Sequence, residues 1–528
     1  MKKVFLHLVL IIIVFSTSAQ KIPKPPFKVS KQQMYEDYDQ FLHIIQTYCP
    51  QLEIRQKTGY DIMAILFERR NKIAALKTYW DFIQFMDGSV DKMLDMHASR
   101  RNCFYSVPNP RYAPGQSFYD STGISAIAHG MDIFGTPNRF RKRNQINLLR
   151  AINAKYIDGQ YYSSAYFEFK NNQTQDSICL RNARIIACNR QPVDKYVRQK
   201  MFNELPAYHL LWDVKREKYF TDQLLVDFNN VLKVENEDGV VYEFVPNHYG
   251  VKIQHVSNKE IRNNFEEYLN SYISWASQFV SYLPEEKVLY IYIEQMFGQE
   301  NYNLLDSIKK IGRNKEIEKV VIDVRNNLGG GDEYWMNILA AIIKHPICFE
   351  INIALNGNND VMAYLSAEFP IEMTNTFRKD TITFLDNKIM WISHENDTIF
   401  PDTNSLEYDG KIYVLQGYNT ASAAHSFTSV AWQIPQMISI GVSSGQIAGF
   451  GLNPWGFQLK HSHYTFSFEP ALDISTSKKW QDVFHCIPEI EVSPTIQDIN
   501  NEIYRGSMSP EEFLPKYDYL FKYIMNLQ

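Results

Sequence analysis

Two segments of the chain, about ninety residues apart, each follow an apolar run and constrain what the chain can fold into. Residues 323–331 follow the run at 319–322 and end in three consecutive glycines. Residues 419–425 follow the run at 411–416 and lead into small residues up to about position 433. Apolar runs of this kind predict buried strands, and small residues after a tight turn predict a helix. We therefore expect Ser422 at a strand-to-helix turn, and a separate glycine loop whose backbone can approach a ligand closely.

Both segments resemble patterns of the S41 serine peptidases, the family of the C-terminal (tail-specific) processing proteases and the tricorn protease core. The pattern D-x-R-x-N-x-G-G is matched here at Asp323, Arg325, Asn327, Gly329 and Gly330. The pattern T/S-A-S-A-x-E is matched around Ser422 except for its final glutamate. The resemblance implies that Ser422 is the nucleophile and that the amides of Ala423 and of Gly329 or Gly330 form an oxyanion hole. Such donors stabilise a tetrahedral intermediate by roughly 3–4 kcal/mol each.

Asp323 and Arg325 stand at the expected carboxyl end of a strand. An aspartate and an arginine so placed can pair and hold the following glycine loop in shape. We therefore expect these two residues to support the site rather than to touch substrate.

A serine hydroxyl needs a neighbouring base before it becomes a good nucleophile. The processing proteases supply a lysine downstream of the serine, but residues 440–451 contain none and the next lysine is Lys460. The tricorn-like branch uses an upstream histidine in a segment resembling L-x-D-x-H-[TA], which is similar to residues 94–98 here. The resemblance makes His97 the candidate base, and an ordinary histidine pKa of about 6.5 suits that role. Without the resemblance, an isolated histidine is more often a packing or capping residue.

His425 occupies the position of the missing family glutamate. Residues three apart share a helix face, so His425 is an alternative base or a substitute for the supporting carboxylate. The missing lysine and glutamate also favour a second interpretation, in which the chain is a catalytically weak or inactive pseudopeptidase that binds peptides.

Beyond about residue 259, predicted helices and strands alternate. Helices are expected at 261–283, 301–311 and 335–343, and strands at 288–293, 319–324 and 437–442. This alternation predicts an α/β fold with a layered sheet, which the resemblance makes ClpP/crotonase-like. Residues 487–495 resemble the closing P-D-x-x-V-x-P-T segment of the family. We place the catalytic domain at residues 259–500 and a helical tail at 501–528.

The first half of the chain predicts two further domains. Residues 31–110 form a helical domain, because apolar side chains from Met34 to Ile45 recur at three- and four-residue spacings. Residues 116–258 alternate polar and apolar positions, which predicts a mainly β domain. Within it, residues 180–197 resemble part of a PDZ domain, which would bind an extended peptide as an added strand. A generic β domain is the alternative.

The first residues have the three-part pattern of a secretory signal. Lys2 and Lys3 precede an apolar run at 4–15, and small residues follow at 16–19. The run is too short to span a bilayer comfortably. We expect a signal peptide at 1–19, a linker at 20–30, and an exported protein, periplasmic or extracellular, without stable membrane insertion after cleavage. A retained N-terminal anchor is the alternative.

Composition limits the partners and cofactors. A formal net charge of −5 over 528 residues, without a basic block, argues against nucleic acid. The six cysteines show no spacing typical of a metal site, and six cysteines allow fifteen full disulfide pairings between which sequence cannot choose. We expect no metal, no organic cofactor, and a peptide or protein substrate.

The interpretation that best fits these observations is an exported serine endopeptidase that forms an acyl-enzyme on Ser422, with His97 as general base. A third class, an enzyme acting on thioesters, is disfavoured because an exported chain would rarely meet coenzyme A.

Overall fold

The computed structural model describes residues 28–95, 97–100, 118–119, 125–126, 151–163, 166–171, 173–204, 210–254, 278–297, 300–447, 454–484 and 487–527. The predicted signal peptide and most of the predicted linker lie outside these residues, as does the part of the predicted helix over 261–283 that precedes residue 278. None of the helices that the structure describes has the length and apolarity needed to span a bilayer.

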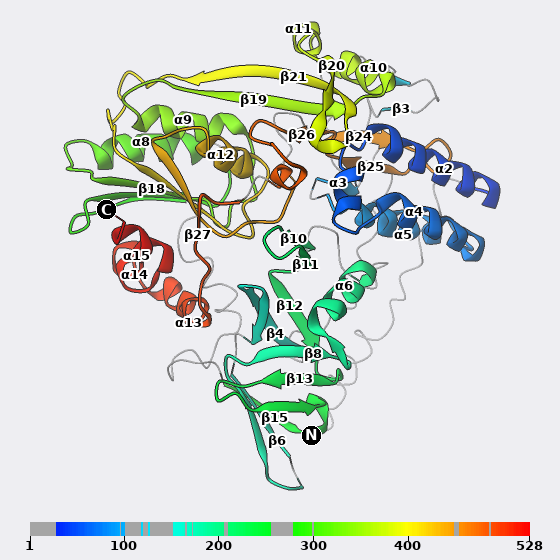
Figure 1. The fold of residues 1–528 in the computed structure, drawn as a ribbon, viewed down its shortest axis with the longest axis horizontal. Coiled ribbons are helices and arrows are strands. Elements are labelled where there is room, and N and C mark those ends of the chain that lie inside the picture. The colour runs from blue at the N-terminus through cyan, green and yellow to red at the C-terminus, as the bar shows by residue number, and fades with distance from the viewer. Residues whose placement is uncertain are drawn as a thin grey trace, which may run out of the picture.

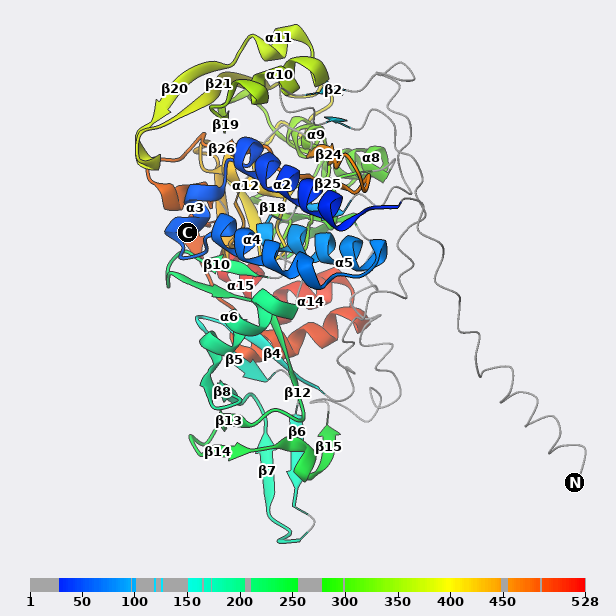
Figure 2. The ribbon, with the colours of Figure 1, turned by 90° about the vertical axis from the view of Figure 1, so that its right-hand side faces the viewer.

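The N-terminal part of the chain is a group of helices, α2 (Lys31–Tyr48), α3 (Leu52–Lys57), α4 (Ile62–Arg70) and α5 (Tyr79–Val90). A capping box at Ser30 starts α2, and Thr78 does the same for α5. The apolar stripe that begins at Met34 is buried. Phe41 packs edge-on against Phe466, so the helices share their core with a strand segment more than 400 residues away. Figure 2 shows these helices in blue beside that segment.

The middle of the chain is mainly β and extends away from the rest of the molecule (Figure 1). Its larger sheet has the order β12-β4-β5-β8-β13-β14, and a three-stranded sheet has the order β15-β6-β7. The strands are β4 (Ala151–Ile157), β5 (Gln160–Ser163), β6 (Tyr166–Lys170), β7 (Ser177–Leu180), β8 (Arg184–Cys188), β9 (Gln191–Pro192), β12 (Gln223–Asp227), β13 (Leu232–Glu235), β14 (Val241–Phe244) and β15 (Gly250–Gln254). The segment compared with a PDZ domain forms β8, β9 and the start of α6 (Val193–Glu204). Its relation to that domain stays a prediction.

A six-stranded sheet in the order β16-β17-β18-β22-β23-β27 forms the centre of the second half of the chain. The strands are β16 (Gln278–Leu283), β17 (Val288–Ile293), β18 (Lys319–Asp323), β22 (Ile412–Gln416), β23 (Met437–Gly441) and β27 (Ile490–Glu491). β16 runs antiparallel to β17, and the other neighbours are parallel. The helix predicted over 261–283 is therefore wrong at its end, because residues 278–283 pair as an edge strand.

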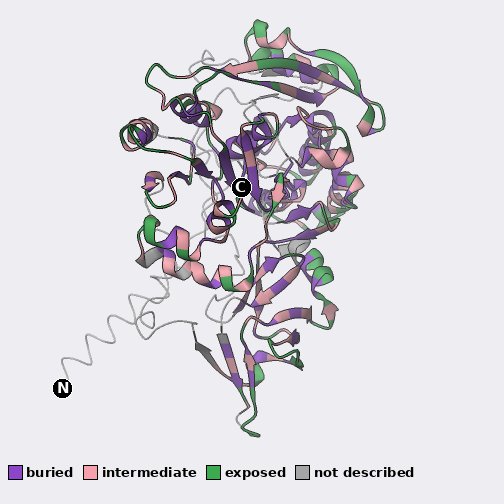
Figure 3. Ribbon diagram, turned by 60° about the vertical axis from the view of Figure 1, so that its left-hand side comes forward, coloured by how far each residue is buried: buried purple, intermediate pink, exposed green. Residues whose placement is uncertain are grey.

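Both faces of this sheet are covered, as a parallel sheet requires. Two successive residues of β18 show that both faces are covered. Ile322 packs with α8 (Glu300–Gly312), α9 (Asp332–Ile342) and α12 (Ala423–Ala431). Val321 packs on the other face with α14 (Pro510–Tyr517) and α15 (Tyr519–Met525). Successive side chains of a strand point to opposite faces, so the C-terminal helices form the third layer of the sandwich rather than a loose tail. Figure 3 shows the buried sheet in purple between them.

Two further sheets join the helical layer to the N-terminal part. One has the order β20-β21-β19-β26, with the long antiparallel strands β19 (Ile347–Asn356) and β21 (Lys388–Ile399), the shorter β20 (Arg378–Ile382) and β26 (Ala471–Asp473). Helices α10 (Asn359–Glu368) and α11 (Ile371–Thr374) connect β19 to β20. The other has the order β1-β25-β24-β3-β2, comprising β1 (Ser99–Arg100), β2 (Phe118–Tyr119), β3 (Ser125–Ala126), β24 (Trp455–Gln458) and β25 (Thr465–Phe468). The β/α alternation did not predict either sheet.

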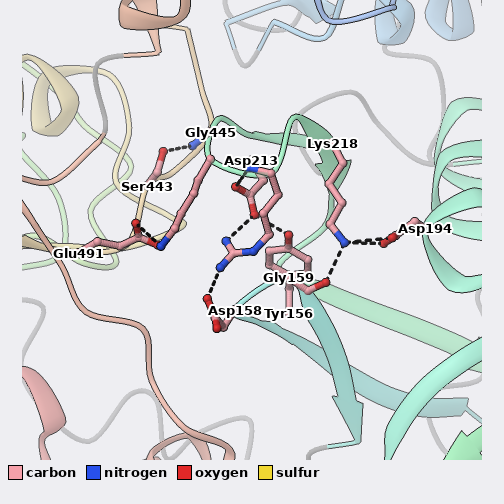
Figure 4. A network of polar contacts seen from close by, with 11 residues as sticks. Tyr156, Asp158, Gly159, Asp194, Asp213, Lys218, Ser443, Gly445 and Glu491 are labelled. Carbon is pink, nitrogen blue, oxygen red and sulfur yellow. Dashed lines mark hydrogen bonds and ion pairs between the residues drawn. The ribbon is translucent and has the colours of Figure 1, made fainter.

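The middle β unit meets the central sheet through a hairpin of β10 (Leu211–Asp213) and β11 (Lys218–Phe220). The amide of Trp212 donates to the carbonyl of Gly445, 3.1 Å away, in the loop after β23. Lys215 forms an ion pair with Glu491 at 3.2 Å, and the Gly445 amide donates to the Ser443 hydroxyl at 3.2 Å (Figure 4). This loop therefore contacts the middle unit.

Candidate active site

Ser422 lies at the turn between β22 and α12, as the sequence predicts. Its backbone has φ +53° and ψ −127°, a conformation that residues with a side chain rarely adopt. The turn is held from the neighbouring strand, because Thr420 donates its hydroxyl to the Val324 carbonyl at 2.9 Å. The Ala421 amide donates to the Asn327 carbonyl at 3.0 Å. The strained turn presents the serine side chain, which is partly exposed, at the N-terminus of α12.

The glycine loop is held by hydrogen bonds and lies against Ser422. Buried Asn327 accepts a hydrogen bond from the Gly329 amide at 2.7 Å and donates to the Ile293 carbonyl at 3.0 Å. Gly329 has φ +99°, and a Cβ there would lie 2.4 Å from the Ser422 Cβ. A side chain at Gly330, where φ is +147°, would lie 2.0 Å from the Met296 carbonyl oxygen. Only glycine allows this close approach of the loop to the serine.

Three backbone amides near this contact point differ in what they donate to. The Gly329 amide is already occupied by Asn327. Within the described part of the chain, the amides of Gly330 and Ala423 donate to no other group. Of the two loop glycines, Gly330 therefore has the amide that is available to a ligand.

His97 lies beside Ser422, although 325 residues separate them in the sequence. Its Nε2 is 3.0 Å from the Ser422 Oγ. Its Nδ1 is 2.9 Å from Oε2 of Glu469, a side chain that is almost completely buried. A serine, a histidine and a carboxylate thus stand in one line, which is the arrangement in which a histidine can take a proton from a hydroxyl.

The pairing of β1 with β25 explains this contact. In their antiparallel register Ser99 lies opposite Ser467. Extending the register by two residues places His97 opposite Glu469, because paired positions move in opposite directions along the two strands. The 3₁₀ turn at Asp91–Met93 and the left-handed Leu94 direct the chain from α5 into β1.

Opposing effects act on the pKa of the imidazole. Burial lowers the pKa of His97, but the hydrogen bond and the charge of Glu469 outweigh it and raise that pKa to about 8. Burial raises the pKa of Glu469, and His97 partly opposes this rise. His97 is therefore mostly protonated at neutral pH and becomes a neutral base as pH rises through about 8.

The other predicted site residues lie further from the serine hydroxyl. His425 is buried in α12, and its amide donates to the Ser422 carbonyl at 2.8 Å. Asp323 and Arg325 form a buried pair with a shortest N–O distance of 2.6 Å at the end of β18. Arg325 also contacts Asp518 at 2.5 Å, at the start of α15. Lys460 lies in the turn between β24 and β25, where its backbone amide donates to Gln40.

Glu469 is the site residue that the sequence analysis missed. It follows β25 in the segment Phe468-Glu469-Pro470, between two buried strands. A lone acidic residue between two buried strands is an informative signal, since buried carboxylates are rare unless paired. Among the described residues no group of histidine, cysteine, aspartate and glutamate side chains is arranged to hold a metal ion.

Comparisons with known proteins found a matching family model and similar solved structures. Residues 287–497 match the model of Peptidase family S41. Solved structures similar to the chain include mature CPAF, with 14% identity, a TM-score of 0.49, and coverage of 94% of this chain and 98% of that chain. The photosystem II D1 C-terminal processing protease is another, with 10% identity, a TM-score of 0.35, and coverage of 92% of this chain and 99% of that chain. The tricorn protease has 12% identity, a TM-score of 0.33, and coverage of 94% of this chain and 37% of that chain. No curated protein sequence matched the chain. The segment at residues 287–497 thus matches peptidase family S41, and this match supports a serine-type peptidase.

Proposed function

We propose that the chain is an endopeptidase that hydrolyses peptide bonds through an acyl-enzyme on Ser422. The observation that carries the proposal is the line Ser422–His97–Glu469, with distances of 3.0 and 2.9 Å. His97 is the general base, and Glu469 holds the imidazole so that Nε2 faces the hydroxyl. This differs from the lysine arrangement of the processing proteases.

In the first step the Ser422 oxygen attacks the peptide carbonyl carbon and His97 takes the hydroxyl proton. The negative oxygen of the tetrahedral intermediate is stabilised by the amides of Gly330 and Ala423, each of which contributes roughly 3–4 kcal/mol. His97 then gives its proton to the leaving amine as the C–N bond breaks. Water repeats the sequence on the acyl-enzyme, which releases the carboxylic acid and regenerates Ser422.

The alternative of an inactive, peptide-binding chain loses its main argument. It relied on the absence of the lysine and of the glutamate that normally follows the serine. Glu469 supplies a carboxylate to His97 from another segment. His425, which replaces the family glutamate, is not needed as a base when His97 already contacts the serine oxygen.

The decisive experiment uses a fluorophosphonate probe, which reacts only with an activated serine. The purified chain should be labelled at Ser422, as located by peptide mass spectrometry, and Ser422→Ala should abolish the label. His97→Ala should reduce labelling strongly. His461→Ala is a matched control, because His461 also pairs with a carboxylate, Glu36 at 2.8 Å, but does so at the turn between β24 and β25. Wild-type protein that stays unlabelled while a control S41 enzyme reacts would refute the proposal.

We also propose that the protein is exported and works in the periplasm or outside the cell. The support is the basic, apolar and small-residue pattern of residues 2–19. Expression of the full chain in a secreting bacterial host should give a mature protein that begins at Gln20, as determined by N-terminal sequencing. A retained Met1 in the purified protein would contradict cleavage.

A further inference from the structure

A second carboxylate, Asp95, lies behind the proposed catalytic residues. It is buried, and its two oxygens accept hydrogen bonds from two different parts of the chain. Oδ1 accepts the His97 amide at 2.8 Å, and Oδ2 accepts the Glu469 amide at 2.7 Å. One side chain therefore holds the backbones of both His97 and Glu469.

This double contact matters because the strand pairing between the two segments is short at this point. β1 has only the two residues Ser99 and Arg100, so its ladder with β25 is short. The imidazole must span from Glu469 to Ser422, with 2.9 Å on one side and 3.0 Å on the other. A shift of one segment along the other would break one of these contacts, and misplacement by about 1 Å can cost 100-fold in rate.

Electrostatics distinguish Asp95 from an ordinary structural residue. A second negative charge beside Glu469 is unfavourable for folding, because two buried carboxylates repel each other. The same charge favours a protonated imidazole. Against the lowering effect of burial, both Glu469 and Asp95 raise the pKa of His97.

We propose that Asp95 is a positioning residue of the catalytic site, which keeps His97 and Glu469 in the register that lets the imidazole bridge Glu469 and Ser422. It does not touch substrate. The inference rests on the proposed function, since it assigns Asp95 a task only if His97 is the base.

The chain contains a matched control in Asp37. This buried carboxylate also accepts two backbone amides, from His461 at 2.9 Å and Ser462 at 2.7 Å. It links the same helical part of the chain to the same strand segment, but at the turn between β24 and β25. Replacing either aspartate by asparagine leaves one oxygen and one NH₂ group, so one of the two amides faces a donor.

The test compares Asp95→Asn, Asp37→Asn and wild type in the full chain by the rate of fluorophosphonate labelling across pH, together with thermal unfolding. Asp95→Asn should lower the plateau rate at least about tenfold. The acid limb, which is the pH range where the labelling rate rises as His97 loses its proton, should move to lower pH, because a negative charge near His97 is removed. Asp37→Asn should lower the melting temperature but keep the wild-type plateau rate and the wild-type acid limb. Equal rates in all three proteins, or equal losses in both variants, would overturn the proposal.

A further variant covers the case in which Asp95→Asn does not fold. Asp95→Glu keeps the charge and both oxygens but displaces them by one methylene. It should retain the wild-type acid limb and lose plateau rate, whereas a full wild-type rate would overturn the proposal. Wild-type protein that is not labelled at Ser422 would refute the proposed function itself, which separates the two failures.

Discussion

At the scale of single residues, Ser422 stores strain in its backbone. Its φ of +53° with ψ −127° suits glycine far better than any residue with a Cβ. Ser422→Gly and Ser422→Ala should both abolish labelling. Ser422→Gly should nevertheless have the larger free energy of unfolding in urea, by about 1 kcal/mol, because relief of strain exceeds the added chain entropy of glycine. A less stable glycine variant would show that the turn is not strained.

Glu469 sets both the orientation and the pKa of His97. In Glu469→Gln the raising effect of the carboxylate is lost and the lowering effect of burial remains. The acid limb of labelling should therefore move from about pH 8 to lower pH. The plateau rate should fall by about 10²–10⁴-fold, since the imidazole loses its fixed tautomer. An unchanged limb would mean that Glu469 does not control His97.

At the scale of elements, the C-terminal helices are bound to the central sheet by a buried charge cluster. Burial lowers the pKa of Arg325, but Asp323 and Asp518 outweigh this and raise it. Asp518 also caps α15 through the Phe521 amide at 2.9 Å. Asp518→Asn keeps an oxygen for the cap but removes one charge beside Arg325. It should lower the free energy of unfolding by about 3 kcal/mol, measured by urea denaturation.

Asp498→Asn provides the comparison for this cluster. Asp498 takes part in the capping box of α13 (Ile496–Asn501) near the surface, and no cation pairs with it among the residues that the structure describes. Its substitution should cost no more than about 1 kcal/mol. Similar losses in the two variants would contradict a special role for the Arg325–Asp518 contact.

At the scale of the whole molecule, the middle unit should be coupled to the loop after β23. Gly445 has φ +66°, and a Cβ there would lie 2.5 Å from the carbonyl oxygen of Trp212. Gly239 has φ +76° with nothing within 4 Å of such a Cβ. Gly239→Ala therefore isolates the backbone penalty of about 1–2 kcal/mol. Gly445→Ala should be clearly more destabilising in thermal unfolding, and equal effects would show that the hairpin and the loop are not tightly packed.

The parts of the protein that depend on neighbours in sequence were predictable. The strands at 288–293 and 319–324 and the helix at 301–311 were predicted within one or two residues, because burial periodicity is a local property. Residues 278–283 were mistaken for helix, since an edge strand of six residues differs little from one face of a helix. The long strands β19 and β21 were missed because each forms through pairing with the other strand, which lies in a different part of the sequence.

The sequence by itself determined the serine turn and the glycine loop, because a strained turn and a close backbone approach require particular residues at neighbouring positions. Only the tertiary structure decided which carboxylate faces His97. Glu469 is more than 370 residues from the histidine, and the antiparallel register of β1 with β25 brings the two together. Such a register depends on contacts between distant segments, and no spacing within either segment records it.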